Sequence, residues 1–322
     1  MQISEVSRIA IGTHLGEMND EDSLLYQKSI EYALLNGINF IDTALNYRGM
    51  RSERDVGSVL SKLMQMEKQV DREDLFLSTK AGIIPGDIDA QLRPENYLQE
   101  ILVDKGVSQR SDLQIIDHHK HVLEPSFYEF AIQQSLKHMQ VDYIDVHYIH
   151  NPEVSLKVLG EDAFYHKLKN LFSFYEQQVE QGLIRYYGLA VWSAFTESPE
   201  TLGYISLEKV MDVANSVAGH SHQFRFIQTP FNQSNHLAAT DLNQQVGDKW
   251  RTLLQAAEEL GVHVTTSAPL DCGRLTKHQQ GNIDELMSFV LKTPGILSTM
   301  IGMRKVDTVK KNLRWLNKVG SL

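Results

Sequence analysis

The chain has 322 residues, of which 42% are hydrophobic and 22% are charged, an ordinary composition for a globular protein. Its formal net charge of −10 argues against non-specific binding to nucleic acid or to an anionic membrane surface. Cys272 is the only cysteine, which excludes a disulfide framework and a cysteine-based metal site. The sequence contains neither a transmembrane run nor a signal peptide, so a cytoplasmic location is expected.

Short apolar runs alternate with longer amphipathic patterns along the whole chain, and each kind of pattern predicts one kind of element. The runs typical of strands cover 7–11, 37–41, 74–79, 143–149, 184–189, 226–228, 262–266 and 297–301. The patterns typical of helices cover 23–35, 94–103, 125–139, 162–181, 199–217, 248–260, 283–291 and 306–319, and a further helix opens at Ser52. The stretch 106–124 is polar and is predicted to be irregular.

Strand–helix units of this kind follow one another across residues 1–322 without a linker. About eight such units predict an α/β fold, a single-domain (β/α)8 TIM barrel. A doubly wound sheet is the alternative, and it favours a G-x-G-x-x-G turn after the first strand. Residues 12–16 read GTHLG and lack that spacing, which favours the barrel.

The stretch 37–60 reads as a buried strand, a polar loop and a helix. The strand ends in Asp42, and the loop carries Tyr47 five positions later. Ser52 is predicted to cap the helix, with Asp55 three residues on as an imperfect capping box. An acid at the end of a buried strand is costly without a partner, so Asp42 requires one elsewhere in the chain.

Three successive predicted barrel strands end in an ionisable residue: Asp42, Lys80 and His150. The carboxyl ends of barrel strands converge on one mouth, where active sites lie. Counting back by two from these strand ends identifies the large residues expected to fill the barrel interior, which are Phe40, Ile38, Tyr148, Val146 and Ile144. His147 has the opposite parity and is expected to face the helices.

These side chains suit proton transfer between a carbonyl and an alcohol. A free tyrosine has a pKa of about 10, and a nearby lysine ammonium is expected to lower the pKa of Tyr47. Asp42 would hold Lys80 in place, and His150 could orient the substrate. The mouth offers no set of metal ligands, so a redox step would need a hydride carrier from outside the chain.

Seven segments together give the chain its resemblance to the aldo-keto reductase superfamily. They are GINFIDTALNY, STKAG, VDYIDVHYIHNPE, GLIRYYGLAVW, FIQTPFN, SAPLDCGRL and TMIGMRKVDTVKKNL, in the family's order over nearly the full length. The resemblance implies NADPH, less often NADH, and reduction of aldehydes or ketones, sugar-like ones included. It also implies a catalytic tetrad of Asp42, Tyr47, Lys80 and His150, in which Tyr47 is the general acid.

The resemblance also implies a cofactor site. Gln228 would hold the nicotinamide carboxamide, and Arg304 would bind a 2′-phosphate through its guanidinium. The full implied set is Thr13, Asp42, Gln228, Ser267, Leu270, Gly273, Leu275, Gly302, Arg304 and Asn312, and the implied substrate pocket is Tyr47, His150 and Trp192.

Two positions depart from the family's pattern. The family usually has Ser-Asn after the fifth strand to bind the carboxamide, whereas this chain has Ala190 and Val191. The family often has an aromatic residue after the seventh strand that stacks on the nicotinamide, whereas this chain has Ser267. We hypothesise that Trp192 compensates by packing near the ring, the alternative being that Trp192 is a core residue.

Other interpretations remain open at this point. Asp42 and Lys80 could form a structural ion pair, and Arg304 could be a surface arginine. The cluster 117–121, DHHKH, could bind a metal, but solvated histidines or a place at the substrate mouth are favoured. The protein as a whole could be an NADP(H)-binding regulatory protein on the same barrel, or a barrel isomerase or lyase without nicotinamide. The sequence does not predict the natural substrate or the oligomeric state.

Overall fold

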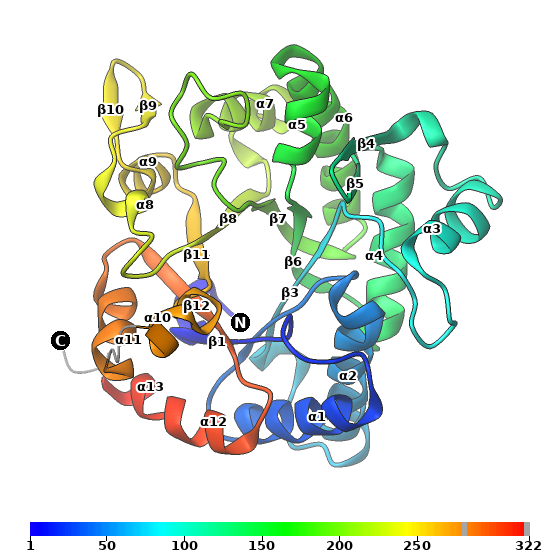
Figure 1. Ribbon diagram of the computed structural model, residues 1–322, viewed down its shortest axis with the longest axis vertical. Coiled ribbons are helices and arrows are strands. Elements are labelled where there is room, and N and C mark those ends of the chain that lie inside the picture. The colour runs from blue at the N-terminus through cyan, green and yellow to red at the C-terminus, as the bar shows by residue number, and fades with distance from the viewer. Residues whose placement is uncertain (279–281, 319–322) are drawn as a thin grey trace.

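A computed structural model describes residues 1–278 and 282–318. Eight parallel strands close into a barrel with helices on its outside (Figure 1). Around the barrel the strands follow the order β1-β12-β11-β8-β7-β6-β3-β2. Their bounds are β1 Ile9–Gly12, β2 Phe40–Asp42, β3 Phe76–Ala81, β6 Ile144–His150, β7 Ile184–Ala190, β8 Phe224–Pro230, β11 His263–Ser267 and β12 Ile296–Gly302. The predicted TIM barrel and its eight predicted strands are therefore confirmed.

Helices connect the strands and cover the barrel. The longer ones are α1 Asp20–Leu34, α2 Arg51–Leu60, α4 Pro125–Met139, α6 Glu161–Glu180, α7 Leu207–Ala218 and α11 Ile283–Lys292. Shorter ones are α3 Pro94–Tyr97, α5 Glu153–Leu159, α8 Leu237–Thr240, α9 Leu253–Glu259, α10 Arg274–His278, α12 Val306–Asn312 and α13 Arg314–Lys318. The predicted helix 306–319 is thus two helices, and Val319 lies outside the described residues. Within the described residues, no helix is both long and apolar enough to cross a bilayer.

The barrel interior is filled by large side chains at alternating strand positions. Phe40 packs edge-on against Phe76 with ring centroids 5.0 Å apart, and Val146 and Tyr148 are fully buried in the same cluster. This confirms the parity argument for Phe40, Val146 and Tyr148. Ile38 and Ile144 instead belong to the larger cluster between strands and helices, because Ile38 precedes its strand and Ile144 lies at the start of β6.

Four local predictions were wrong. The stretch 106–124 is not irregular throughout, since it contains an antiparallel hairpin, β4 Leu113–Ile116 with β5 His119–Val122. The alternation of buried and exposed residues was not recognised in the sequence because some of the buried residues, such as Gln114 and His121, are polar. The helix predicted over 199–217 begins later, because residues 199–206 are not helical. The helix predicted over 248–260 also begins later, because residues 249–251 form strand β10, which pairs with β9 Gln244–Val246 in a second hairpin. Ser52 does not cap α2, since its hydroxyl donates to the Thr13 carbonyl at 2.8 Å and Met50 occupies the cap position.

Candidate active site

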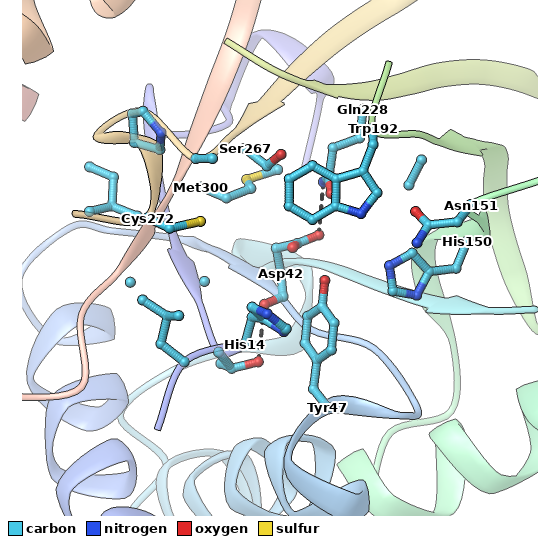
Figure 2. A pocket seen from close by; sticks show the side chains of 18 of the residues that line it. His14, Asp42, Tyr47, His150, Asn151, Trp192, Gln228, Ser267, Cys272 and Met300 are labelled. Atoms are coloured by element: carbon cyan, nitrogen blue, oxygen red, sulfur yellow. Dashed lines mark hydrogen bonds between the residues drawn. The ribbon is translucent and has the colours of Figure 1, made fainter. Parts of the chain in front are cut away.

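A cavity of about 500 Å³ opens at the carboxyl ends of the barrel strands. Figure 2 shows Tyr47, His150 and Asn151 at one side of it and Cys272 at the other. Most of the site residues predicted from the sequence line this cavity, namely Thr13, Asp42, Tyr47, His150, Trp192, Gln228, Ser267, Leu270, Gly273 and Gly302. Lys80, Leu275, Arg304 and Asn312 are not among the lining residues.

Asp42 finds the partner that its position required. Lys80, fully buried on β3, donates from Nζ to Asp42 Oδ2 at 2.6 Å and to the Thr43 carbonyl at 2.8 Å. The other carboxylate oxygen of Asp42 accepts from the Ser78 hydroxyl at 2.6 Å and from the Gln228 amide at 3.1 Å. Because both carboxylate oxygens accept hydrogen bonds, the Asp42 side chain is held in one position at the floor of the cavity.

Tyr47 lies above this ion pair, with the Lys80 Nζ 5.0 Å from the centre of its ring. Burial opposes the charge of Lys80, but Asp42 and Tyr47 outweigh burial and raise the pKa of Lys80, so the amine is a cation at neutral pH. Burial raises the pKa of the Tyr47 phenol, Lys80 acts in the opposite direction, and Asp42 adds to the rise. The expectation that Lys80 lowers the pKa of Tyr47 below its ordinary value was wrong, because burial outweighs the single cation.

Two imidazoles flank the Tyr47 ring. The His150 ring meets it edge-on, with 5.7 Å between the ring centroids. The His14 ring belongs to the loop that follows β1, and its centroid lies 4.6 Å from that of Tyr47. Burial, helped by the positive charge of Lys80, lowers the pKa of both histidines, so both are neutral at pH 7. His150 lines the cavity, and its Nδ1 atom is buried without a hydrogen-bond partner among the described residues.

Sequence reasoning missed two polar residues that line the cavity, His14 and Asn151. His14 belongs to the GTHLG stretch, and its position directly after the first strand could have indicated that it lies at the mouth of the barrel. Asn151 has a left-handed backbone (φ 54°) and donates its N–H to the Ala190 carbonyl at 2.7 Å. A non-glycine residue in this conformation at a strand end is typical of functional sites.

His119, from the β4–β5 hairpin, also lines the cavity. Part of the 117–121 cluster therefore lies at this cavity, and its place at a substrate mouth stays a prediction. His121 is buried, and its ring contacts the Ser155 hydroxyl at 2.6 Å and the His150 carbonyl at 2.8 Å. Within residues 1–278 and 282–318, no group of three histidine, cysteine or acidic side chains is arranged to hold a metal ion.

Trp192 is held at the cavity by a buried carboxyl. Its backbone N–H donates to Glu153 Oε1 at 2.8 Å, and the second oxygen of Glu153 is buried without a partner among the described groups. Burial, opposed by the Trp192 N–H, raises the pKa of Glu153 to about 7. The Trp192 side chain is 52% exposed and lies across the cavity from Tyr47 in Figure 2, so the interpretation as a core residue was wrong.

His147 points away from the site, as its parity predicted. Its side chain is buried, and Nδ1 contacts the Tyr175 hydroxyl of α6 at 2.7 Å. Burial lowers the pKa of His147 to about 3, so this histidine is a neutral packing residue.

The far side of the cavity has the features of a phosphate-binding loop. Ala268, Asp271 and Cys272 all have φ near +50°, and Gly273 has φ +87°. Non-glycine residues in this conformation are uncommon and cluster at binding sites. Within the loop, the N–H groups of Asp271 and Gly273 donate to the carbonyls of Ala268 and Leu270, both at 2.9 Å. Leu275 is buried behind this loop, 3% exposed, so it supports the loop without facing the cavity.

Arg304 and Asn312 lie beyond the cavity, around α12. Asn312 is buried, and Arg304 is paired with Asp22 of α1, its side chain remaining 37% exposed. Four of the five guanidinium N–H groups have no protein partner in the described part of the chain, so a phosphate can still bind there. Together with Gln228 and the strained loop, these residues fit a phosphorylated nicotinamide dinucleotide.

Comparisons with known proteins agree with this geometry. A model of the Aldo/keto reductase family matches residues 8–286. The chain is 24% identical to Protein tas of Escherichia coli (strain K12), over 97% of this chain and 90% of that protein. It has the fold of an aldo/keto reductase from Klebsiella pneumoniae in complex with NADP and acetate (17% identity, TM-score 0.63, 97% of this chain and 86% of that one). A glycerol dehydrogenase from Gluconobacter oxydans is similar too (18% identity, TM-score 0.61, 98% and 91% covered).

Proposed function

The chain belongs to the aldo/keto reductase family, and we propose that it is an NADPH-dependent oxidoreductase that reduces the carbonyl of a small aldehyde or ketone, sugar-like carbonyls included. The observation that carries the proposal is the buried Asp42–Lys80 pair beneath Tyr47, at 2.6 Å between Oδ2 and Nζ. A purely structural ion pair has no need of a tyrosine hydroxyl that opens into a cavity above it (Figure 2).

Tyr47 donates the proton to the carbonyl oxygen. Its raised pKa keeps the phenol protonated at neutral pH, which is the form that reduction requires. Lys80 stabilises the phenolate that remains after the transfer, and Asp42 keeps Lys80 charged and in place. His150, a neutral imidazole beside Tyr47, orients the carbonyl oxygen through a ring N–H.

NADPH is the proposed cofactor, and NADH is the weaker alternative. A bound nicotinamide supplies the hydride for the carbonyl carbon. Gln228 would bind the carboxamide, the Leu270–Gly273 loop the pyrophosphate, and Arg304 with Asn312 the adenosine end. The NADP found in the Klebsiella relative supports this choice.

The experiment that tests the proposal is NADPH consumption, followed by absorbance, with a panel of aldehydes, ketones and sugars. The proposal predicts turnover of at least one carbonyl compound and binding of NADPH measured by fluorescence. Absence of binding for both NADPH and NADH would contradict it.

A second candidate function rests on one observation. Ala190 and Val191 line the cavity where the family usually has hydrogen-bonding side chains, so the carboxamide loses two partners. Two lost hydrogen bonds weaken affinity by about ten- to a hundredfold. The second candidate is therefore an NADP(H)-binding regulatory protein with little turnover. Such a protein would bind NADPH but would not consume it with any carbonyl compound in the panel.

A further inference from the structure

The arginine proposed for the 2′-phosphate is already paired with a carboxylate of the same chain. Arg304 Nη1 donates to Asp22 Oδ2, and the two side chains are 37% and 8% exposed. Arg304 follows β12 and Asp22 lies in the first turn of α1; Figure 1 shows α12 and α1 side by side on the outside of the barrel. The carboxylate is therefore sealed in protein, whereas the guanidinium reaches solvent.

Asp22 is fixed in place by its own backbone surroundings. Its Oδ2 accepts the Glu17 N–H at 2.6 Å, and its N–H donates to Asn19 Oδ1 at 2.9 Å. Burial opposes its charge, but the Glu17 N–H and Arg304 outweigh burial and lower the pKa of Asp22, so it is an anion at neutral pH.

The loop in front of Asp22 is itself held by hydrogen bonds. The Tyr26 hydroxyl donates to the Leu15 carbonyl at 2.5 Å, and Arg48 Nε donates to the Glu17 carbonyl at 3.0 Å. Gly16 has φ +112°, and a Cβ at that position would lie 2.8 Å from Asp22 Oδ2. The absence of a side chain at Gly16 thus makes room for the ion pair with Arg304.

Arg304 belongs to a group of two arginines and two aspartates that are paired two by two. Arg48 is the other cation close to Asp22, and it is itself paired with the buried Asp55 at 2.6 Å. These four side chains carry no net charge between them. A 2′-phosphate of nearly two negative charges would therefore meet a guanidinium whose charge is already balanced by the carboxylate directly behind it.

We propose that Asp22 is a specificity-determining residue that limits the preference for 2′-phosphorylated cofactor by holding a fixed negative charge against Arg304. The proposal rests on the function proposed above, because it concerns that cofactor site. An anion within about one side-chain length of a phosphate weakens its binding by about tenfold at low ionic strength, and salt screens the effect. NADH lacks the 2′-phosphate and is insensitive to this charge.

The test is a fluorescence titration of NADPH and of NADH against wild type, Asp22→Asn and Asp20→Asn, at low and high salt. Asparagine keeps an oxygen to accept from Glu17 and Arg304, so only the charge is removed. Asp20 is a matched control, because it lies on the same turn and pairs with Arg51 but its side chain is 97% exposed. We expect Asp22→Asn to tighten NADPH about tenfold at low salt, less at high salt, and to leave NADH unchanged.

The outcomes separate the inference from the proposed function. If both dinucleotides bind and Asp22→Asn leaves their affinity ratio unchanged, or weakens NADPH, the charge of Asp22 does not set the preference. If the affinities for NADPH and NADH shift together, Asp22 acts only through the shape of its loop, and the inference is wrong. If neither dinucleotide binds wild type, the proposed function and this inference fall together.

Discussion

Two ion pairs mark the two ends of the site, and they are built differently. Lys80 and Asp42 extend from neighbouring barrel strands, with side chains 0% and 5% exposed. Arg304 and Asp22 extend from a loop and a helix start, with Arg304 37% exposed. The first pair is enclosed and cannot change partners, which suits proton transfer at a fixed distance. The second can accept an arriving anion at the open side of its arginine, which suits binding.

The largest effect is expected from breaking the enclosed pair. Lys80→Met leaves Asp42 buried without its cation, which should lower the free energy of unfolding by about 3–5 kcal/mol and turnover by at least about 100-fold. Urea unfolding and NADPH consumption measure the two effects. In Lys80→Met/Asp42→Asn the stability should partly return while activity stays lost. An unchanged unfolding free energy in Lys80→Met would show that the pair is not energetically coupled.

A smaller effect, on stability alone, is expected at Glu153. Burial raises its pKa to about 7 in the folded protein, above its ordinary value of 4.5. The folded state then binds the proton more tightly than the unfolded state, so stability falls as pH rises from about 4.5 to about 7. Glu153→Gln should remove this loss and be more stable than wild type at about pH 8, by about 1–3 kcal/mol, but not at about pH 4.5.

Thermal unfolding across this pH range measures the difference. Glu258→Gln is the control, because Glu258 is an exposed glutamate on α9, away from the Glu153 carboxyl. A pH-independent difference between Glu153→Gln and wild type would mean that folding does not raise the pKa of the Glu153 carboxyl.

The smallest effect is expected at Trp192. If its exposed ring packs near the nicotinamide, Trp192→Ala should weaken NADPH by about two- to tenfold. Trp250→Ala is the matched control, because Trp250 is similarly exposed, 47%, on the β9–β10 hairpin and does not line the cavity. Equal NADPH affinities for the two variants and wild type would show that Trp192 does not compensate for Ser267.

The two ion pairs also differ in how far the sequence could predict them. The position of Lys80 beside Asp42 follows from strand ends that converge and side chains that alternate, so the periodicity of the sequence was sufficient. Asp22 and Arg304 are 282 residues apart, one in the first turn of α1 and the other in the loop after β12, and no periodic pattern of the sequence relates the two positions. The contact between His14 and Tyr47 and the left-handed backbone of Asn151 likewise have no signal in the periodicity of the sequence. The raised pKa of Tyr47 depends on burial, which no local pattern reveals.

The most direct test of the account compares NADPH affinity with carbonyl reduction in wild type and Tyr47→Phe. Phenylalanine keeps the ring between His14 and His150 and removes only the hydroxyl. We expect Tyr47→Phe to have the same NADPH dissociation constant as wild type and a turnover at least about 100-fold lower. Equal turnover in the two proteins would contradict it, because the proton would then come from another group.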